Sequence, residues 1–319
     1  MRLVRVELTR LISRRACVVL MLFGVLGAGI VAGSFIHDHA PPSAGEVAAA
    51  IKLAERSAHQ RYVVHQLARC EAGKGRFPRG FDCQDIVPTA SDYLYTPRMI
   101  LRGQALGDVI VPMLLALAIA ALLLGATYIG ADWSSGTIST LLLFESRRTR
   151  VWLAKAISVF LGTAVTAGLA MGLGLLTIVW FGHRWHNMTY IDGQTHHLTW
   201  VWLRSTLVVG LAALSGFAIV MAMRFTAAAL GVVLAYALVG EAVLRSFWGG
   251  SEQWLLSNHL FGFVLGHWRV QVYPSDCYRG PCRPQNFVFG LENTSVYLCL
   301  LAAGALLVSY VTFRRRDVP

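Results

Sequence analysis

The chain has 319 residues, of which 55% are hydrophobic and 14% are charged. One soluble core of ordinary size would not bury so much apolar surface, so the composition argues against a soluble enzyme. The 28 Lys and Arg residues outnumber the 17 Asp and Glu residues, which gives a formal net charge of +11. In a soluble protein this charge would suggest a nucleic-acid partner. In a membrane protein it is explained by the basic residues beside the spans that fix their orientation.

Six apolar, nearly uncharged stretches are long enough to cross the membrane, for which a helix needs roughly 20 residues. A helix satisfies its own backbone hydrogen bonds in hydrocarbon, so these stretches predict an all-α integral membrane protein with six transmembrane helices. The predicted spans are residues 16–36, 108–130, 151–181, 201–223, 225–244 and 296–313.

The basic residues near the span ends predict how the chain is oriented, because such residues in short segments resist translocation. They lie in the N-terminal segment, between the second and third spans (Lys155 among them), between the fourth and fifth (Arg224), and in the tail 314–319. All of these segments fall on one side of the membrane. We therefore expect a multi-pass protein of the cell membrane with both termini in the cytoplasm.

The first 15 residues alternate arginines with apolar side chains at roughly helical spacing. The apolar side chains are Leu3, Val6, Leu8, Leu11 and Ile12. This pattern predicts an amphipathic helix over residues 1–15 that lies in the headgroup layer. The alternative is that the arginines only hold the N-terminus on the cytoplasmic side, and the sequence leaves both interpretations open.

Residues 37–107 form the first large external segment. Ser43 and Glu46 have the spacing of a capping box, and apolar residues then recur at helical intervals. We expect a helical insertion whose helix begins near Ala44 and ends near Gly73, where a Gly-Lys-Gly run interrupts the pattern. A shorter external loop, 182–200, joins the third and fourth spans.

Four of the six cysteines, Cys70, Cys83, Cys277 and Cys282, fall in external segments, where disulfides persist. Pairing Cys70 with Cys83 and Cys277 with Cys282 is the simplest of three connectivities, although the sequence does not choose between them. A zinc site built from Cys and His is the alternative, but the chain has no CxxC pair. The ten histidines also lie in external segments without a recognisable ligand set, so we assign no metal site.

The link 131–150 between the second and third spans is too amphipathic for a simple connector. Ser134 or Ser135 can cap a helix, and Gly136 allows a partner to approach closely. Leu141, Leu142 and Leu143 form an apolar face ahead of a basic cluster that includes Arg148. These features predict a helix along the cytoplasmic surface that presents its apolar face to another protein.

Glu241 and Arg245 lie four residues apart on the fifth span, so they can pair across one turn. The pair would be either a local salt bridge or a gate that faces the substrate path.

The segment 245–292 is too apolar for a solvated loop. We expect part of it to enter the membrane as a re-entrant hairpin sheltered by protein.

The link carries a series of residues that is typical of one class of transporter subunit. In chain order these are Asp132, Gly136, Thr137, Leu141, Leu142, Arg148, Arg150 and Lys155. In this series and in its overall plan, the chain resembles the permease subunits of ATP-binding cassette (ABC) exporters of the type-2 class. The proline that these permeases usually have before the basic cluster is absent, and Glu145 lies near its place.

The resemblance implies that the link is a coupling helix that docks on a cytoplasmic ATPase subunit. The coupling residues would be Asp132, Ser135, Gly136, Thr137, Leu141, Leu142, Arg148 and Arg150. The sequence has no GxxxxGK[ST] phosphate-binding loop, so ATP and Mg would be bound by two separate ATPase subunits, and the chain itself would have no catalytic residue. The cargo would be an amphipathic, drug-like or lipid-like molecule that is moved outward.

A second permease, identical or a paralogue, would complete the transporter within the lipid bilayer. The glycine pairs Gly29 with Gly33 and Gly168 with Gly172 would let helices approach closely, either within the chain or at a dimer contact. An ion-coupled secondary transporter is the main alternative, although such proteins usually have repeated halves and acidic residues deep in their spans. An intramembrane hydrolase is a further alternative, whose motifs the sequence does not contain.

Overall fold

The computed structural model describes residues 2–74, 78, 81–94, 98–101, 103–188, 193–247, 251–272 and 284–315. The chain forms two compact units. The bundle unit comprises Met1–Ser34, Ile100–Ile178 and Tyr190–Pro319, and the insertion unit comprises Phe35–Met99 and Val179–Thr189. The two units are described separately below.

Five helices are long and apolar enough to cross a membrane. They are α2 (Arg15–Asp38), α6 (Gly103–Ser134), α8 (Arg148–Arg184), α9 (Gln194–Met223) and α13 (Leu291–Arg315). They correspond to the predicted spans at 16–36, 108–130, 151–181, 201–223 and 296–313. Each helix begins before the predicted span, and all but α9 also end after it. The prediction of a mostly helical, multi-pass membrane protein is thereby confirmed.

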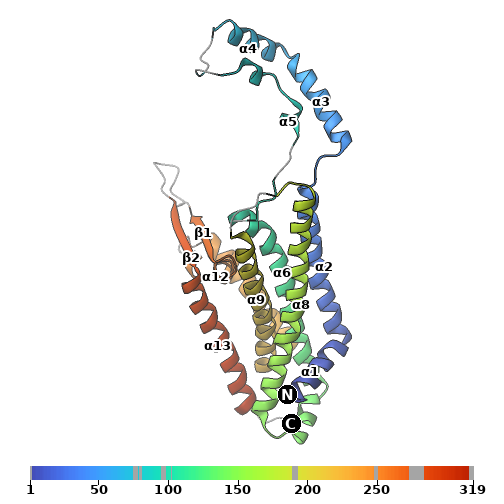
Figure 1. The fold of residues 1–319 in the computed structure, drawn as a ribbon. Helices are drawn as coiled ribbons and strands as arrows, with labels where there is room; N and C mark the ends of the chain where they lie inside the picture. Colours follow the sequence, from blue (N-terminus) through green and yellow to red (C-terminus); the bar gives the residue numbers. More distant parts are fainter. Residues whose placement is uncertain are drawn as a thin grey trace. The chain divides into compact units, whose positions relative to one another are not determined.

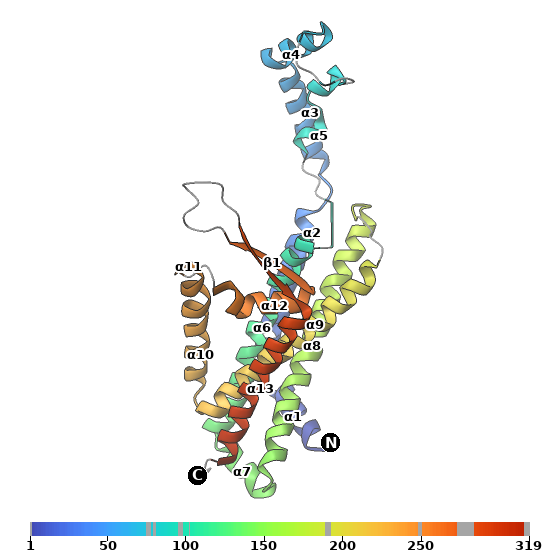
Figure 2. The same ribbon diagram turned by 90° about the vertical axis from the view of Figure 1, so that its left-hand side faces the viewer.

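The predicted fifth span is helical but is not one continuous α-helix. It consists of α10 (Thr226–Ala235), the π-helical segment η2 (Tyr236–Val243) and α11 (Leu244–Phe247). We refer to these three pieces as helix 226–247. Figure 2 shows α10 at the periphery of the bundle, and large apolar side chains along the helix are exposed, among them Leu234 and Leu238.

The centre of the bundle is a close crossing of α6 and α9. A Cβ atom placed on Gly125 would lie 2.0 Å from the carbonyl oxygen of Ala213, and one placed on Gly216 would lie 2.1 Å from that of Leu122. The two backbones therefore touch, which only glycine allows at these positions. The sequence analysis did not single out this pair of glycines.

The two glycine pairs that the sequence did indicate have different surroundings. Gly168 and Gly172 of α8 lie against the indole of Trp202 in α9, and Trp202 donates a hydrogen bond to the carbonyl of Gly168 at 2.8 Å. Among the described residues, no atom lies within 4 Å of a Cβ placed on Gly29 or Gly33. Packing within the chain thus accounts for the pair in α8.

Helix α1 (Arg2–Ser13), α7 (Thr137–Phe144) and the C-terminal end of α13 lie at one end of the bundle, which we call the α7 end (Figure 1). The opposite end, which we call the hairpin end, carries η3 (Ser251–Trp254), α12 (Leu256–Leu265), β1 (His267–Val272) and β2 (Gln285–Gly290).

The strands β1 and β2 pair antiparallel, with His267 opposite Gly290 and Val272 opposite Gln285. This hairpin is a correction to the all-α prediction. Side chains along β1 are alternately exposed and half-buried. Successive side chains of a strand point to opposite faces, so one face of β1 is covered. The apolar α12 packs against α13, α9, α6 and both strands, so this part of segment 245–292 is sheltered by protein.

The insertion unit contains α3 (Ala44–Ala58), α4 (Arg61–Glu71), η1 (Cys83–Ile86) and α5 (Ala90–Tyr93). The predicted capping box is present: the backbone amide of Ser43 donates to Glu46 at 2.7 Å, and the amide of Glu46 donates to the Ser43 hydroxyl at 3.3 Å. The hydrogen bonds that the backbone amide and then the hydroxyl of Ser43 donate to the Glu46 carboxylate lower the pKa of Glu46. The single helix expected from Ala44 to Gly73 is wrong, because the chain breaks at His59 and Gln60 into two helices.

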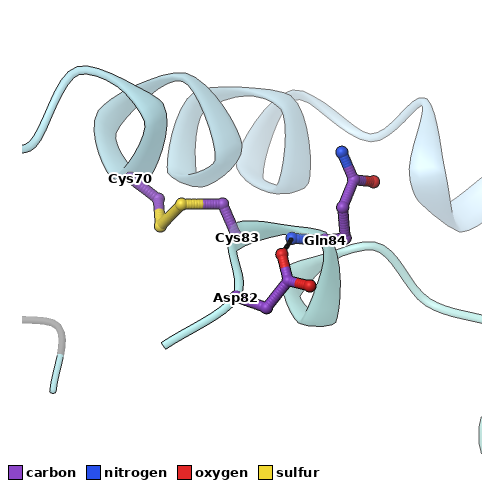
Figure 3. The surroundings of a disulfide bond; sticks show 4 residues. All are labelled: Cys70, Asp82, Cys83 and Gln84. Carbon is purple, nitrogen blue, oxygen red and sulfur yellow. Dashed lines mark hydrogen bonds between the residues drawn. A yellow bond between two sulfur atoms is a disulfide. The ribbon is translucent and has the colours of Figure 1, made fainter. Parts of the chain in front are cut away.

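A disulfide joins Cys70 at the end of α4 to Cys83 at the start of η1, as the simplest pairing predicted (Figure 3). Asp82 begins η1 by accepting a hydrogen bond from the backbone amide of Gln84 at 3.0 Å. The second predicted pair, Cys277 and Cys282, lies outside the described residues.

Candidate functional site

The link between α6 and α8 folds into a short helix between two sharp turns. Helix α6 continues to Ser134, and Gly136 then adopts a left-handed conformation with φ of +67° before α7 begins. A side chain is strained in this conformation, which explains the glycine. Helix α7 spans Thr137–Phe144 and is shorter than the predicted range 131–150, because α6 and α8 take up both ends of that range.

The C-terminal end of α7 is strongly exposed and apolar. Leu143 and Phe144 are each 86% exposed, whereas Ile138 is buried against the bundle. Leu141 and Leu142, the other two residues of the predicted apolar face, are half-buried. Leu143 and Phe144 have the largest exposed fractions of the large apolar side chains that the structure describes.

Beneath α7 lies a buried ion network that joins three helices. Lys155 of α8 and Asp132 of α6 are 0% exposed, and Glu7 of α1 is 1% exposed. The Lys155 ammonium lies 3.0 Å and 3.1 Å from the two carboxylate oxygens of Glu7 and 2.5 Å from one oxygen of Asp132. One cation therefore binds an anion from each of two other helices.

Further groups complete the network. Arg14 forms an ion pair with Asp132 and donates to the carbonyl of Tyr128 at 2.7 Å. The Tyr128 hydroxyl donates to the carboxylate of Glu7, and Arg10 lies 3.5 Å from Glu7 at the edge of the network. The two buried carboxylates are thus matched by Lys155 and Arg14, which is the condition for keeping charges inside a protein.

The network determines how α1 is placed. Glu7 and Leu11 of α1 point into the bundle, where Leu11 lies against Gly162 of α8, and the Ser158 hydroxyl donates to the carbonyl of Val4 at 3.1 Å. Helix α1 therefore packs on α8 and α6. Sequence analysis missed Glu7, although it is the only acidic residue before Asp38 and lies among arginines.

The start of α8 is bound to the end of α13. Arg148 donates to the carbonyl oxygens of Phe313 and Arg314 at 3.5 Å and 3.3 Å, which satisfies C-terminal groups of α13. The Thr149 hydroxyl lies 3.1 Å from that of Tyr310, and the Trp152 indole donates to Ser309 at 3.2 Å. Helix α7 is consequently anchored through α8 to both α1 and α13.

Besides Leu141 and Leu142 of α7, the predicted coupling residues divide into three groups. Ser135, Gly136 and Thr137 form the turn before α7, where the Ser135 and Thr137 hydroxyls are 2.6 Å apart. Asp132 and Arg148 bind other parts of the bundle, so they position α7 from below. Arg150 is exposed and lies 3.9 Å from Glu145, a contact that contributes little.

The predicted pair Glu241 and Arg245 lies at the hairpin end, with 3.5 Å between their charged groups. The two residues belong to a larger cluster. We call Tyr236, Glu241, Arg245, Glu252 and Ser257 the Glu241 cluster. Arg245 also lies 3.4 Å from Glu252 and donates to Ser257 at 3.0 Å, so the pair is not confined to its own helix.

No group of three His, Cys, Asp or Glu side chains in the described part of the chain lies close enough to hold a metal ion. No protein-family model matches this chain, and no curated protein matches it.

Proposed function

We propose that the chain is the permease half of an ATP-driven exporter and that α7 is its coupling helix. The observation that carries this proposal is the exposed pair Leu143 and Phe144, located between two long apolar helices at the α7 end of the bundle, where α1 and the C-terminal end of α13 also lie. A soluble protein that received these two side chains in an apolar groove would remove them from water. Such burial contributes about 1.5–3 kcal/mol per large side chain.

The contacts beneath α7 support a mechanical role. A force on α7 would act on α6 and α8 at once, because Asp132 and Lys155 join these two helices through a buried ion pair. It would also act on α13 through Arg148, and on α1 through Glu7. Closely packed elements of this kind move together as rigid bodies, which is how a docked partner could change the arrangement of the spans.

The ATPase activity would belong to two partner subunits, since the sequence lacks a phosphate-binding loop. Both termini and α7 would then lie in the cytoplasm. The cargo would be an amphipathic or lipid-like molecule, because the five long helices are mostly apolar and their charged residues are concentrated at the ends. A second permease, identical or a paralogue, would complete the transporter.

The test is an affinity purification of the full-length chain in mild detergent, followed by mass spectrometry and an ATPase assay. We expect a stoichiometric subunit that contains a phosphate-binding loop, with vanadate-sensitive ATP hydrolysis. In the double variant Leu143→Ala/Phe144→Ala, this subunit should be lost while the chain still elutes as a single species. Leu169→Ala is the matched control, because Leu169 is also strongly exposed but lies in the middle of α8.

Two results would contradict the proposal. The first is a preparation without any ATPase subunit or vanadate-sensitive activity, which would favour the ion-coupled transporter instead. The second is retention of the subunit by the double variant at the level of the control, which would remove α7 from the docking surface.

A further inference from the structure

Helix 226–247 is held in the bundle differently at its two ends. At the α7 end it packs closely, because a Cβ placed on Gly130 of α6 would lie 2.7 Å from the side chain of Thr226. Along its middle, Leu234, Leu238 and Val239 are between 56% and 60% exposed. At the hairpin end, the side-chain hydrogen bonds that the structure describes between this helix and α12 come from the Glu241 cluster.

The Glu241 carboxylate has a full set of hydrogen-bond donors. One oxygen accepts from the Tyr236 hydroxyl and from the backbone amide of Ser257, each at 3.0 Å. The other accepts from the Ser257 hydroxyl at 2.7 Å and lies 3.5 Å from Arg245. A carboxylate has about four acceptor positions, so all of them are used.

The same cluster caps α12. The first amides of a helix have no partner within the helix, and a carboxylate or hydroxyl commonly satisfies them. Here the amide of Leu256 donates to the Tyr236 hydroxyl at 3.0 Å and the amide of Ser257 donates to Glu241. The N-terminus of α12 is therefore capped by side chains of a different helix.

The π-helical segment accounts for this arrangement. In an α-helix, residues five apart point about 140° away from each other, so Tyr236 and Glu241 would not face the same neighbour. A π-helical turn hydrogen-bonds residues five apart and so brings them onto the same face of the helix. The η2 segment begins at Tyr236 and includes Glu241, and it brings both side chains to the start of α12.

We propose that the Glu241 cluster is a latch that holds the hairpin end of helix 226–247 on α12, and that its release opens the path by which cargo leaves the bundle. The latch is polar and reversible, because its hydrogen bonds can be exchanged for water, whereas the close packing of Thr226 on Gly130 at the α7 end acts as the hinge. The role of this opening in cargo release rests on the proposed transport function. The latch itself depends only on contacts within the chain.

The first arm of the test is hydrogen exchange on the full-length chain in detergent, followed at the amides of Leu256 and Ser257, which bond directly to the latch. Glu241→Gln keeps the shape of the side chain but replaces an acceptor oxygen with a donor. We expect exchange at both amides to rise about tenfold, and a smaller rise in Ser257→Ala. Ser246→Ala is the control, because the hydrogen bond that the described residues provide for the Ser246 hydroxyl lies within its own helix, to the carbonyl of Ala242.

Unchanged exchange at both amides in Glu241→Gln, with α6 and α9 as protected as in the wild type, would overturn the latch. The second arm uses the complex with its ATPase subunits, trapped with ATP and vanadate. We expect the same two amides to lose protection in the trapped wild-type complex. Full protection in a complex that hydrolyses ATP would show that the cluster is only structural, which would overturn the release step. Absence of any ATPase partner would instead contradict the proposed function and, with it, the transport role of the latch.

Discussion

Lys155 shows how much a single side chain can organise in this protein. It lies at the start of α8 in a basic segment. From the sequence, Lys155 looks like one of the basic residues that orient a membrane protein. In the structure it is 0% exposed and bound to Glu7 and Asp132. Its charge therefore holds helices together in addition to any effect on topology.

Replacing Lys155 with Met tests this role. The substitution leaves two buried carboxylates with Arg14 as their principal cation, so we expect a loss of about 3–5 kcal/mol in the free energy of unfolding. Thermal unfolding in detergent, followed by size-exclusion chromatography, would measure the effect. Arg150→Met is the matched control because Arg150 is exposed and makes only a 3.9 Å contact, for which about 0–1 kcal/mol is expected. Equal stability of the two variants would mean that the ion network contributes nothing.

Among the elements, the crossing of α6 and α9 is the most constrained. The reciprocal contacts of Gly125 and Gly216 with the carbonyl oxygens of the facing helix leave no room for a methyl group. In a membrane, helices associate through such close packing and not through the hydrophobic effect. The glycines thus determine the distance between the two helices.

Substituting these glycines with alanine should separate the helices. We expect Gly125→Ala and Gly216→Ala each to reduce the free energy of unfolding by about 1–3 kcal/mol, the usual cost of overpacking. Gly29→Ala is the control, since nothing in the described chain lies near its Cβ, and there alanine should be neutral or favourable by up to about 1 kcal/mol. Tolerance of alanine at Gly125 and Gly216, with unchanged melting temperatures, would be inconsistent with the crossing.

For the whole molecule, the arrangement of the ends gives a prediction of topology. The segments rich in basic residues, α1, the link with α7, and the end of α13, lie together at the α7 end of the bundle. The positive-inside rule assigns such segments to the cytoplasm. The insertion unit contains the disulfide between Cys70 and Cys83. Because disulfides persist where thiols are oxidised, we expect this unit to lie outside the cell.

Cysteine labelling in intact cells tests this topology. In a background that carries Cys299→Ser, a membrane-impermeant maleimide should modify Ser57→Cys of α3 and should leave Ser135→Cys of the link unmodified until the cells are opened. Labelling of Ser135→Cys in intact cells would reverse the orientation and with it the site at which an ATPase could dock.

Elements that depend on local composition and spacing could be predicted from the sequence. Apolar length predicted the five long helices, the Ser43 and Glu46 spacing predicted the cap of α3, and the spacing of Cys70 and Cys83 agreed with their pairing. It did not predict the break at His59, the β-hairpin or the π-helical segment, since none of these has a strong local signal.

Only the tertiary structure brought together residues that lie far apart along the chain. Glu7, Asp132 and Lys155 come from three helices, and Glu241 meets Ser257 of another helix. Local patterns cannot show which charge binds which, because a buried ion pair depends on the distance between elements. Local composition therefore predicted the five long apolar helices, whereas the packing of these helices decided where their charges are neutralised and which surface of α7 stays exposed.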